Sequence, residues 1–152
     1  MSDGYDVIAL PASPTKDKQT HLIPLSAPAQ AILVGRASLP GDFVFGGVKA
    51  FPSWSHGRSL LDAALAEASA KLKPWTLHDI RRSVATGMAE LGVTPHIVEA
   101  VLNHVSGHKA GIAGVYNRAS YEREKRAALA MWADHMLAAV EGRAGNVLAI
   151  RA

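Results

Sequence analysis

The chain has 152 residues, which fits one domain with a substantial core and is too short for two ordinary domains. Apolar residues make up 49% and charged residues 19%, a composition that excludes a disordered protein. The net charge of +3 and pI of about 9.4 permit a polyanionic partner without identifying one, and the lack of cysteine excludes disulfides and thiolate metal sites.

The N-terminus, "MSDGYDVIALP", has neither a basic segment nor a long apolar run. No apolar stretch approaches the roughly 20 residues that a membrane span needs. We therefore expect a cytoplasmic protein that does not act at a membrane.

A β-hairpin is predicted over residues 5–25. The apolar runs "YDVIAL" and "THLIPL" are separated by "PASPTKDKQ", whose composition is typical of a turn. Pro24 cannot donate to a strand ladder, so the second strand should lie at a sheet edge or end there.

Helices dominate the rest of the predicted domain. We expect a short helix from Ser26 to about Gly35, an irregular loop over 39–57, and an alanine-rich helix over 59–71 that the following Lys-Pro stops. The fold class is α+β and mostly helical, in one domain spanning 1–152. It divides into a hairpin at 5–25, a helical body at 26–142 and a tail at 143–152.

A helix–turn–helix pair is predicted in the middle of the chain. Thr76 and Asp79 form a box-like start for a helix to about Leu91, and Gly92 ends it. A second helix follows from Thr94 and Pro95 to about Leu102. The expected core residues of the pair are Leu77, Ile80, Val84, Met88 and Leu91 in the first helix, and Ile97, Val98, Val101 and Leu102 in the second.

The C-terminal part is predicted to form a charged amphipathic helix over about Tyr121 to Glu141, and "NVLAI" at 146–150 is a candidate terminal strand. Four cations in and near this helix, Arg118, Arg123, Lys125 and Arg126, are candidates for phosphate contacts. For most of them a solvated helix face is the better interpretation.

Two neighbouring arginines of the central pair fall on different helix faces. Arg81 lies beside the apolar stripe, whereas Arg82 lies on the solvated side. An arginine at the margin of a core is held in place, so its guanidinium offers a fixed fork to a phosphate. Arg81 is therefore the better candidate for a functional site, and Arg82 for a solvated charge or a backbone contact.

Residues 78–104 allow three interpretations. Taken singly, His78 and His104 are typical surface or helix-cap residues. A helix-turn-helix DNA-binding module without chemistry is the alternative function, although "PHIVEAVL" lacks the Lys or Arg that a recognition helix uses. A metal site from His104 and His108, assisted by His96 or His78, has no nearby carboxylate, and no metal is expected.

Three separated segments, "HDIRR", "LNH" and "VYNR", resemble the C-terminal catalytic half of the tyrosine recombinases, the phage-integrase family. The family's pattern is H-x-x-R, then a His or Trp in a Leu-Gly-His-like segment, and then a nucleophilic Tyr. His78 and Arg81 fill the first pair. His104 follows Arg81 by twenty-three residues, and Tyr116 follows His104 by twelve. These spacings agree with the family.

A fourth segment extends the resemblance to the hairpin. The family carries a lysine in a hairpin turn before a "VPL" strand, and "TKDKQTHLIPL" matches it with Lys16 eight residues before Pro24. Lys18 is a rival for this role, but the spacing to the strand favours Lys16. The resemblance covers residues 5 to about 140.

The resemblance implies an enzyme that breaks and rejoins double-stranded DNA in site-specific recombination, either integration or excision. Tyr116 would attack the scissile phosphate and form a 3′-phosphotyrosyl link, with His78 helping to activate the phenol. Arg81 and His104 would bind the non-bridging oxygens, and Lys16 would protonate the leaving 5′-oxygen. Reversal rejoins DNA without ATP or metal, so no cofactor is expected.

Other roles follow from the same resemblance. Lys18, Arg82 and Arg118 are expected to contact DNA. Tyr121 is a rival nucleophile, but the glycines at 107, 111 and 114 favour Tyr116 because they supply a mobile tether before it. A homo-oligomer on DNA, formed through the C-terminal helix or tail, is a further expectation.

The sequence departs from the family pattern at two places. Asn103 stands where the family usually has glycine, in the turn that presents His104. The family's first catalytic arginine, upstream of the hairpin, and its N-terminal DNA-clamping domain have no counterpart in the 152 residues. We therefore expect the chain to behave as an N-terminally truncated catalytic domain, whether a remnant gene, an excised piece or a part that needs a complement, and to be inactive or weak in isolation.

Overall fold

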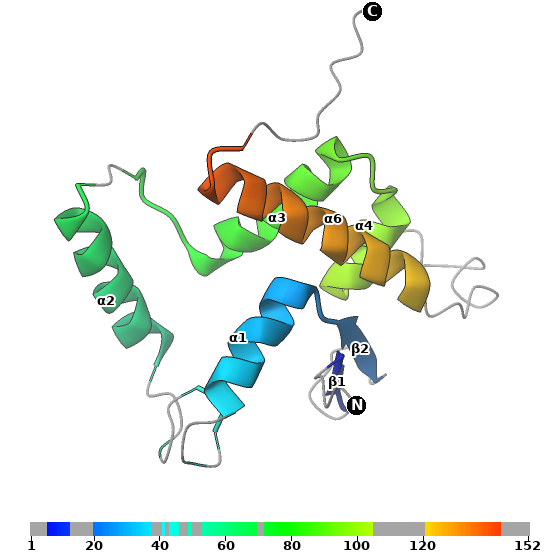
Figure 1. Ribbon diagram of the computed structural model, residues 1–152, viewed down its shortest axis with the longest axis horizontal. Coiled ribbons are helices and arrows are strands. Elements are labelled where there is room, and N and C mark those ends of the chain that lie inside the picture. The colour runs from blue at the N-terminus through cyan, green and yellow to red at the C-terminus, as the bar shows by residue number, and fades with distance from the viewer. Residues whose placement is uncertain are drawn as a thin grey trace, which may run out of the picture.

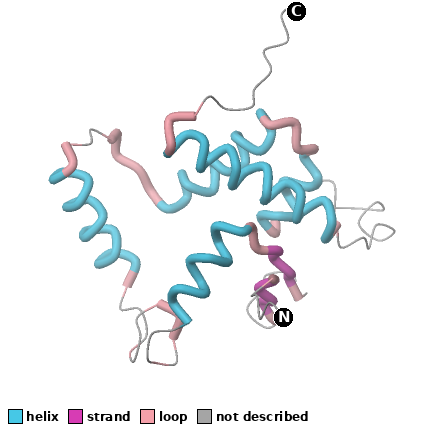
Figure 2. The backbone as a smooth tube through the Cα atoms, in the orientation of Figure 1, coloured by secondary structure: helices cyan, strands magenta, loops and turns pink. Residues whose placement is uncertain are grey.

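The computed structural model describes residues 6–12, 20–37, 41, 43–45, 49, 53–69, 72–104 and 121–143. Within these ranges the chain is mostly helical with one small sheet, as predicted (Figures 1 and 2). The elements are β1 (Val7–Leu10), β2 (His21–Pro24), α1 (Ala27–Ala37), α2 (Trp54–Glu67), α3 (Leu77–Glu90), α4 (Pro95–Leu102) and α6 (Glu122–Val140).

The predicted hairpin is confirmed. β1 and β2 pair antiparallel, from Val7 opposite Pro24 to Leu10 opposite His21. Pro24 is the last residue of β2, as expected for a residue that cannot donate to the ladder, and its side chain is fully buried. The polar segment that carries Lys16 joins the two strands.

The structure corrects the boundaries of the alanine-rich helix. The predicted range 59–71 is wrong at both ends, since α2 covers Trp54–Glu67. The helix starts earlier because the Ser53 side chain accepts a hydrogen bond from the His56 N–H at 3.1 Å, which caps the first turn. It ends earlier because the chain turns at Ser69, which has a left-handed φ of 56°.

The central helix pair agrees with the prediction within a residue at each end. The backbone N–H and the hydroxyl of Thr76 both donate to the Asp79 carboxylate at 2.8 Å, and these bonds hold the pKa of Asp79 below its ordinary value. Gly92, at φ 83°, makes the left-handed turn after α3, and Pro95 occupies the first turn of α4.

The core lies where α3, α4 and α6 pack against one another, while α2 lies apart from this group (Figure 1). The buried apolar residues of the core are Met88, Ile97, Val98, Ala128 and Ala138. The predicted apolar stripe of α3 is only half buried. Met88 is 0% exposed, but Leu77 and Ile80 are 44% and 51% exposed, so the apolar stripe is exposed at the N-terminal end of α3.

The C-terminal helix runs from Glu122 to Val140, within a residue of the predicted bounds at each end. The candidate strand at 146–150 lies outside the described residues. Among the described helices, none combines the length and apolar character needed to cross a membrane.

A close contact between α3 and α6 depends on glycine. A Cβ atom added at Gly87 would lie 2.2 Å from Cζ3 and 2.8 Å from Cη2 of the Trp132 indole. Carbon atoms do not approach so closely, so the bare backbone of Gly87 is what allows Trp132 to lie against α3.

Gly87→Ala should therefore destabilise the fold. Overpacking typically costs about 1–3 kcal/mol, which exceeds the gain of at most about 1 kcal/mol from replacing a helical glycine by alanine. Urea unfolding should show a lower midpoint. Gly35→Ala, in α1, is the matched control because an added Cβ there meets nothing within 4 Å, and it should raise the midpoint. A Gly87→Ala protein as stable as the parent would contradict this packing.

Candidate active site

Arg81 links the two helices of the central pair. It lies half buried on α3. Its Nη2 donates a hydrogen bond of 2.6 Å to the backbone carbonyl of Leu102, which is the last residue of α4. This contact bridges twenty-one residues of sequence. A guanidinium has five N–H donors, so one bond to a carbonyl leaves capacity for a phosphate oxygen. As expected from its place beside the apolar stripe, Arg81 is held rather than freely solvated.

His104 lies two residues after the carbonyl that Arg81 contacts. Asn103 precedes it in the left-handed conformation, with φ 48° and ψ 45°. The backbone N–H of His104 donates to the Glu99 carbonyl at 2.9 Å, and the His104 side chain is exposed. Asparagine tolerates the left-handed region better than most residues, so it forms a turn of the kind that glycine favours.

The predicted site residues fall into two groups. His78 is exposed on the first turn of α3, one turn before Arg81, and Arg81 contacts the end of α4 that leads into His104. The structure thus brings Arg81 and the turn of His104 together, with His78 on the same helix as Arg81. The other predicted residues, Lys16, Lys18, Tyr116 and Arg118, lie outside the described residues.

Arg82 behaves differently from its neighbour. Its side chain is 73% exposed and forms a 3.5 Å ion pair with Asp79, one turn earlier on α3. An exposed pair of this kind contributes little to stability. Arg82 is thus a solvated cation, in agreement with its place on the helix wheel.

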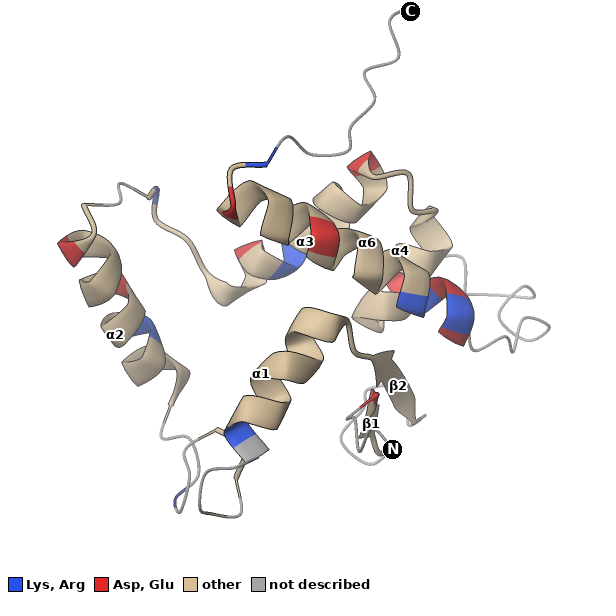
Figure 3. Cartoon of the chain, in the orientation of Figure 1, with Lys and Arg blue, Asp and Glu red and all other residues tan. Residues whose placement is uncertain are grey.

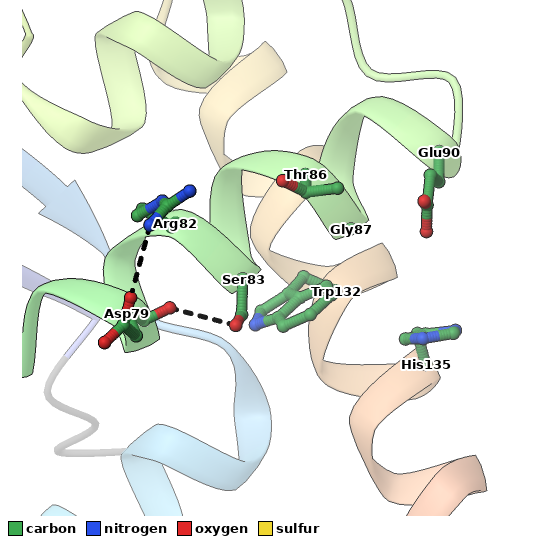
Figure 4. Close-up of a pocket in the computed structure, with 8 residues that line it drawn as sticks. All are labelled: Asp79, Arg82, Ser83, Thr86, Gly87, Glu90, Trp132 and His135. Atoms are coloured by element: carbon green, nitrogen blue, oxygen red, sulfur yellow. Dashed lines mark hydrogen bonds and ion pairs between the residues drawn. The ribbon is translucent and has the colours of Figure 1, made fainter. Parts of the chain in front are cut away.

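A shallow groove of about 440 Å³ lies between α3 and α6 (Figure 4). Trp132 forms part of it, with the His135 ring stacked 5.6 Å away. It contains Arg82 but neither His78, Arg81 nor His104. Its lining residues are Asp79, Arg82, Ser83, Thr86, Gly87, Glu90, Trp132 and His135. None of the predicted catalytic residues lines this groove, and its two carboxylates, Asp79 and Glu90, would repel a phosphate.

The hairpin is fastened to α6 by polar contacts. Lys125 is 5% exposed, and its Nζ donates to the Leu22 carbonyl in β2 at 2.7 Å. The next residue, Arg126, forms a two-point ion pair with Asp6, just before β1. We expected most of the cations in and near α6 to lie on a solvated helix face, and for Lys125 this is wrong. Lys125 lies on the same buried face of α6 as Ala128, three residues later, and this face meets the hairpin.

The amino-acid sequence is similar to those of two known proteins. The chain is 32% identical over 135 residues to the prophage integrase IntA of Escherichia coli strain K12, a match covering 88% of the chain and 32% of that protein. It is 30% identical over 145 residues to the prophage integrase IntZ of the same strain, covering 93% of the chain and 34% of that protein. The chain belongs to the phage-integrase family.

The chain spans about a third of the length of these curated relatives. No protein-family model matches it, and no solved structure does so.

Tyr121, the rival candidate for the nucleophile, makes a contact between two helices. It is half buried at the start of α6, with a left-handed φ of 49°. Its ring lies 5.3 Å from that of His96 in α4, at an interplanar angle of 59°. Tyr121 therefore helps to join α6 to α4.

Metal ligation was the third interpretation of the histidines. In the part of the chain that the structure describes, no group of three or more His, Asp or Glu residues is arranged to hold a metal ion. His108, which the H-x3-H spacing would pair with His104, lies outside that part.

Proposed function

We propose that this integrase chain is the catalytic part of a site-specific recombinase that breaks and rejoins double-stranded DNA through a 3′-phosphotyrosyl intermediate. The observation that carries the proposal is the Arg81–Leu102 contact, which joins the helix of His78 and Arg81 to the turn before His104. These are the segments that a phosphate-binding site of this family would need side by side. Trapping a covalent protein–DNA adduct on a nicked substrate tests the proposal.

In the proposed reaction, the Tyr116 oxygen attacks the scissile phosphorus in line with the 5′-oxygen. A bond forms between phosphorus and the phenolic oxygen, and the bond from phosphorus to the 5′-oxygen breaks. The phenolic proton passes to His78, and a proton from the Lys16 ammonium passes to the leaving 5′-oxygen. The products are a 3′-phosphotyrosyl link and a free 5′-hydroxyl, and the reverse reaction rejoins a strand.

The reaction needs fixed positive charge because negative charge is spread over the oxygens around phosphorus in the transition state. A free phenol has a pKa of about 10 and attacks poorly at neutral pH, so a base or a cationic site must assist it. The held guanidinium of Arg81 and the exposed imidazole of His104 would bind the non-bridging oxygens. His78, exposed one turn from Arg81, is accessible to a phenol brought in from outside the helix pair.

Tyr116 is the proposed nucleophile in preference to Tyr121. The contact between Tyr121 and His96, together with the place of Tyr121 at the start of α6, supports this choice. An aromatic ring that packs one helix against another would have to leave that contact to reach a phosphate.

The alternative, a helix-turn-helix module without chemistry, has less support. A recognition helix presents polar or basic side chains to base edges. In α4 the buried residues are Ile97 and Val98, and the exposed side chains at its start are those of Pro95 and His96. The short helix packs against both α3 and α6, and it carries no Lys or Arg.

We expect the 152-residue chain to bind double-stranded DNA weakly, with little sequence preference and strong salt dependence. Contacts from cations such as Arg82 to phosphates release counterions, so the affinity should fall at least about 10²-fold between 50 and 200 mM salt. Fluorescence anisotropy with unrelated duplexes measures this. Arg82→Ala should lower the slope of log affinity against log salt by about one.

Strong, sequence-specific binding would favour the alternative function, a helix-turn-helix module without chemistry. Tight binding to one short palindrome that persists in high salt is what a helix-turn-helix reader of base edges would give. It is not expected from phosphate contacts alone.

A further inference from the structure

Lys125 is a buried cation with a specific partner. It is 5% exposed, and its Nζ lies 2.7 Å from the Leu22 carbonyl, 103 residues earlier in the chain. Removing an ammonium from water is costly, and an apolar side chain of similar length would fill the same space without that cost. A lysine at this position therefore suggests a need for a directional contact to β2 rather than for burial alone.

The neighbouring Arg126 reinforces the same joint. Both of its terminal nitrogens contact the two carboxylate oxygens of Asp6, with Nη2 3.1 Å from Oδ2. A two-point pair fixes orientation as well as distance. Lys125 holds β2 and Arg126 holds the residue before β1, so consecutive residues of α6 fasten both strands of the hairpin. Figure 3 shows charged residues gathered at this N-terminal end of α6.

The joint connects two parts of the chain that the proposed reaction uses. The hairpin strands β1 and β2 flank the segment that contains Lys16. At the other side, α6 begins six residues after Tyr116. The base of the segment that carries the proposed acid is therefore fastened to the helix that follows the proposed nucleophile.

We propose that Lys125 is a positioning residue that sets the hairpin on α6, so that Lys16 is aligned with the leaving 5′-oxygen when Tyr116 attacks. This inference rests on the proposed function. A general acid must lie within hydrogen-bond reach of the atom that it protonates, and a displacement of about 1 Å can lower a rate about 10²-fold. Loss of the Lys125 contact should therefore weaken protonation without removing Lys16.

The first test measures the joint itself in the 152-residue chain. Lys125→Met removes the donor and keeps an unbranched side chain of similar length. Hydrogen exchange should show faster exchange of the amides of β1 and β2 and unchanged exchange in α3 and α4. Arg123→Met is the matched control, because Arg123 is an exposed cation two residues earlier on the same helix. It should leave exchange in the hairpin unchanged.

The second test measures positioning of the acid. The chain is supplied with the arginine-bearing segment of a matching prophage integrase and given nicked DNA with either oxygen or sulfur at the 5′-bridging position. Sulfur leaves without a proton because a thiol has a pKa of about 8.5. The complemented Lys125→Met variant should cleave the DNA with a bridging oxygen about 10²-fold more slowly than the parent protein does. It should cleave the DNA with a bridging sulfur at close to the parental rate.

The controls separate this inference from the proposed function. Lys16→Ala should be rescued by sulfur in the same way, and Arg123→Met should not change the ratio of the two rates. Unchanged hairpin exchange in Lys125→Met would overturn the inference, as would a cleavage defect that sulfur does not rescue when it rescues Lys16→Ala. Failure of sulfur to rescue Lys16→Ala would instead overturn the role of Lys16 in the proposed function, and the exchange result would still decide whether Lys125 holds the hairpin.

Discussion

The 152-residue chain alone should form no detectable covalent adduct with a nicked suicide substrate, in which the leaving strand diffuses away and traps the intermediate. This expectation rests on the resemblance, which implies that the family's first catalytic arginine belongs to a segment upstream of the hairpin. Removing one preorganised donor from an oxyanion-type site typically costs about 10² to 10³ in rate. Positioning by a DNA-clamping domain would make the attack effectively intramolecular, a contribution that can reach several kcal/mol.

Adding the arginine-bearing segment of a matching prophage integrase should restore the adduct, visible as a protein band shifted by the attached strand in a denaturing gel. The control is the same segment without the 152-residue chain, which should give no adduct. Robust adduct formation by the chain alone would show that its active site is complete without a complement.

Tyr116→Phe should abolish the adduct in the complemented protein, because it removes the only oxygen that attacks phosphorus in the proposed reaction. The expected loss is complete within the sensitivity of the gel. Tyr121→Phe is the matched control and should leave adduct formation within a few-fold of the parent, since it keeps the ring that lies against His96. An adduct that survives Tyr116→Phe would show that another residue is the nucleophile.

Local sequence signals predicted much of the fold. The Thr76–Asp79 box, Gly92 and Pro95 predicted both ends of α3 and the start of α4 to within a residue, because each acts through its own backbone or its nearest turn. The start of α2 was missed because Ser53, a good N-cap residue, lies inside a stretch with several glycines and prolines.

Burial was harder to predict than helix ends. The apolar stripe of α3 continues through Leu77 and Ile80, yet both residues are exposed, whereas Met88 in the same stripe is fully buried. A helix wheel locates the apolar face of a helix, but how much of that face is buried depends on which helices lie against it.

The candidate site was predictable in part. The helix wheel separated Arg81 from Arg82 correctly, and the structure adds the Leu102 carbonyl as the partner that holds Arg81. Lys125 was missed because it stands among charged residues in sequence. A signal was present, since Lys125 stands three residues before Ala128, a helical spacing, and both are buried. Its partner in β2 is 103 residues away, and no local pattern indicates such a contact.

Mapping the DNA-linked residue tests the central claim most directly. The trapped adduct from the complemented protein is digested with nuclease and trypsin, and the peptides are analysed by mass spectrometry. Cleavage after Lys109, Arg118 and Arg123 places Tyr116 and Tyr121 on different peptides, 110–118 and 119–123. We predict a nucleotide phosphate on Tyr116 in peptide 110–118. A nucleotide on peptide 119–123, or on any residue other than Tyr116, would contradict the assignment of Tyr116 as the nucleophile.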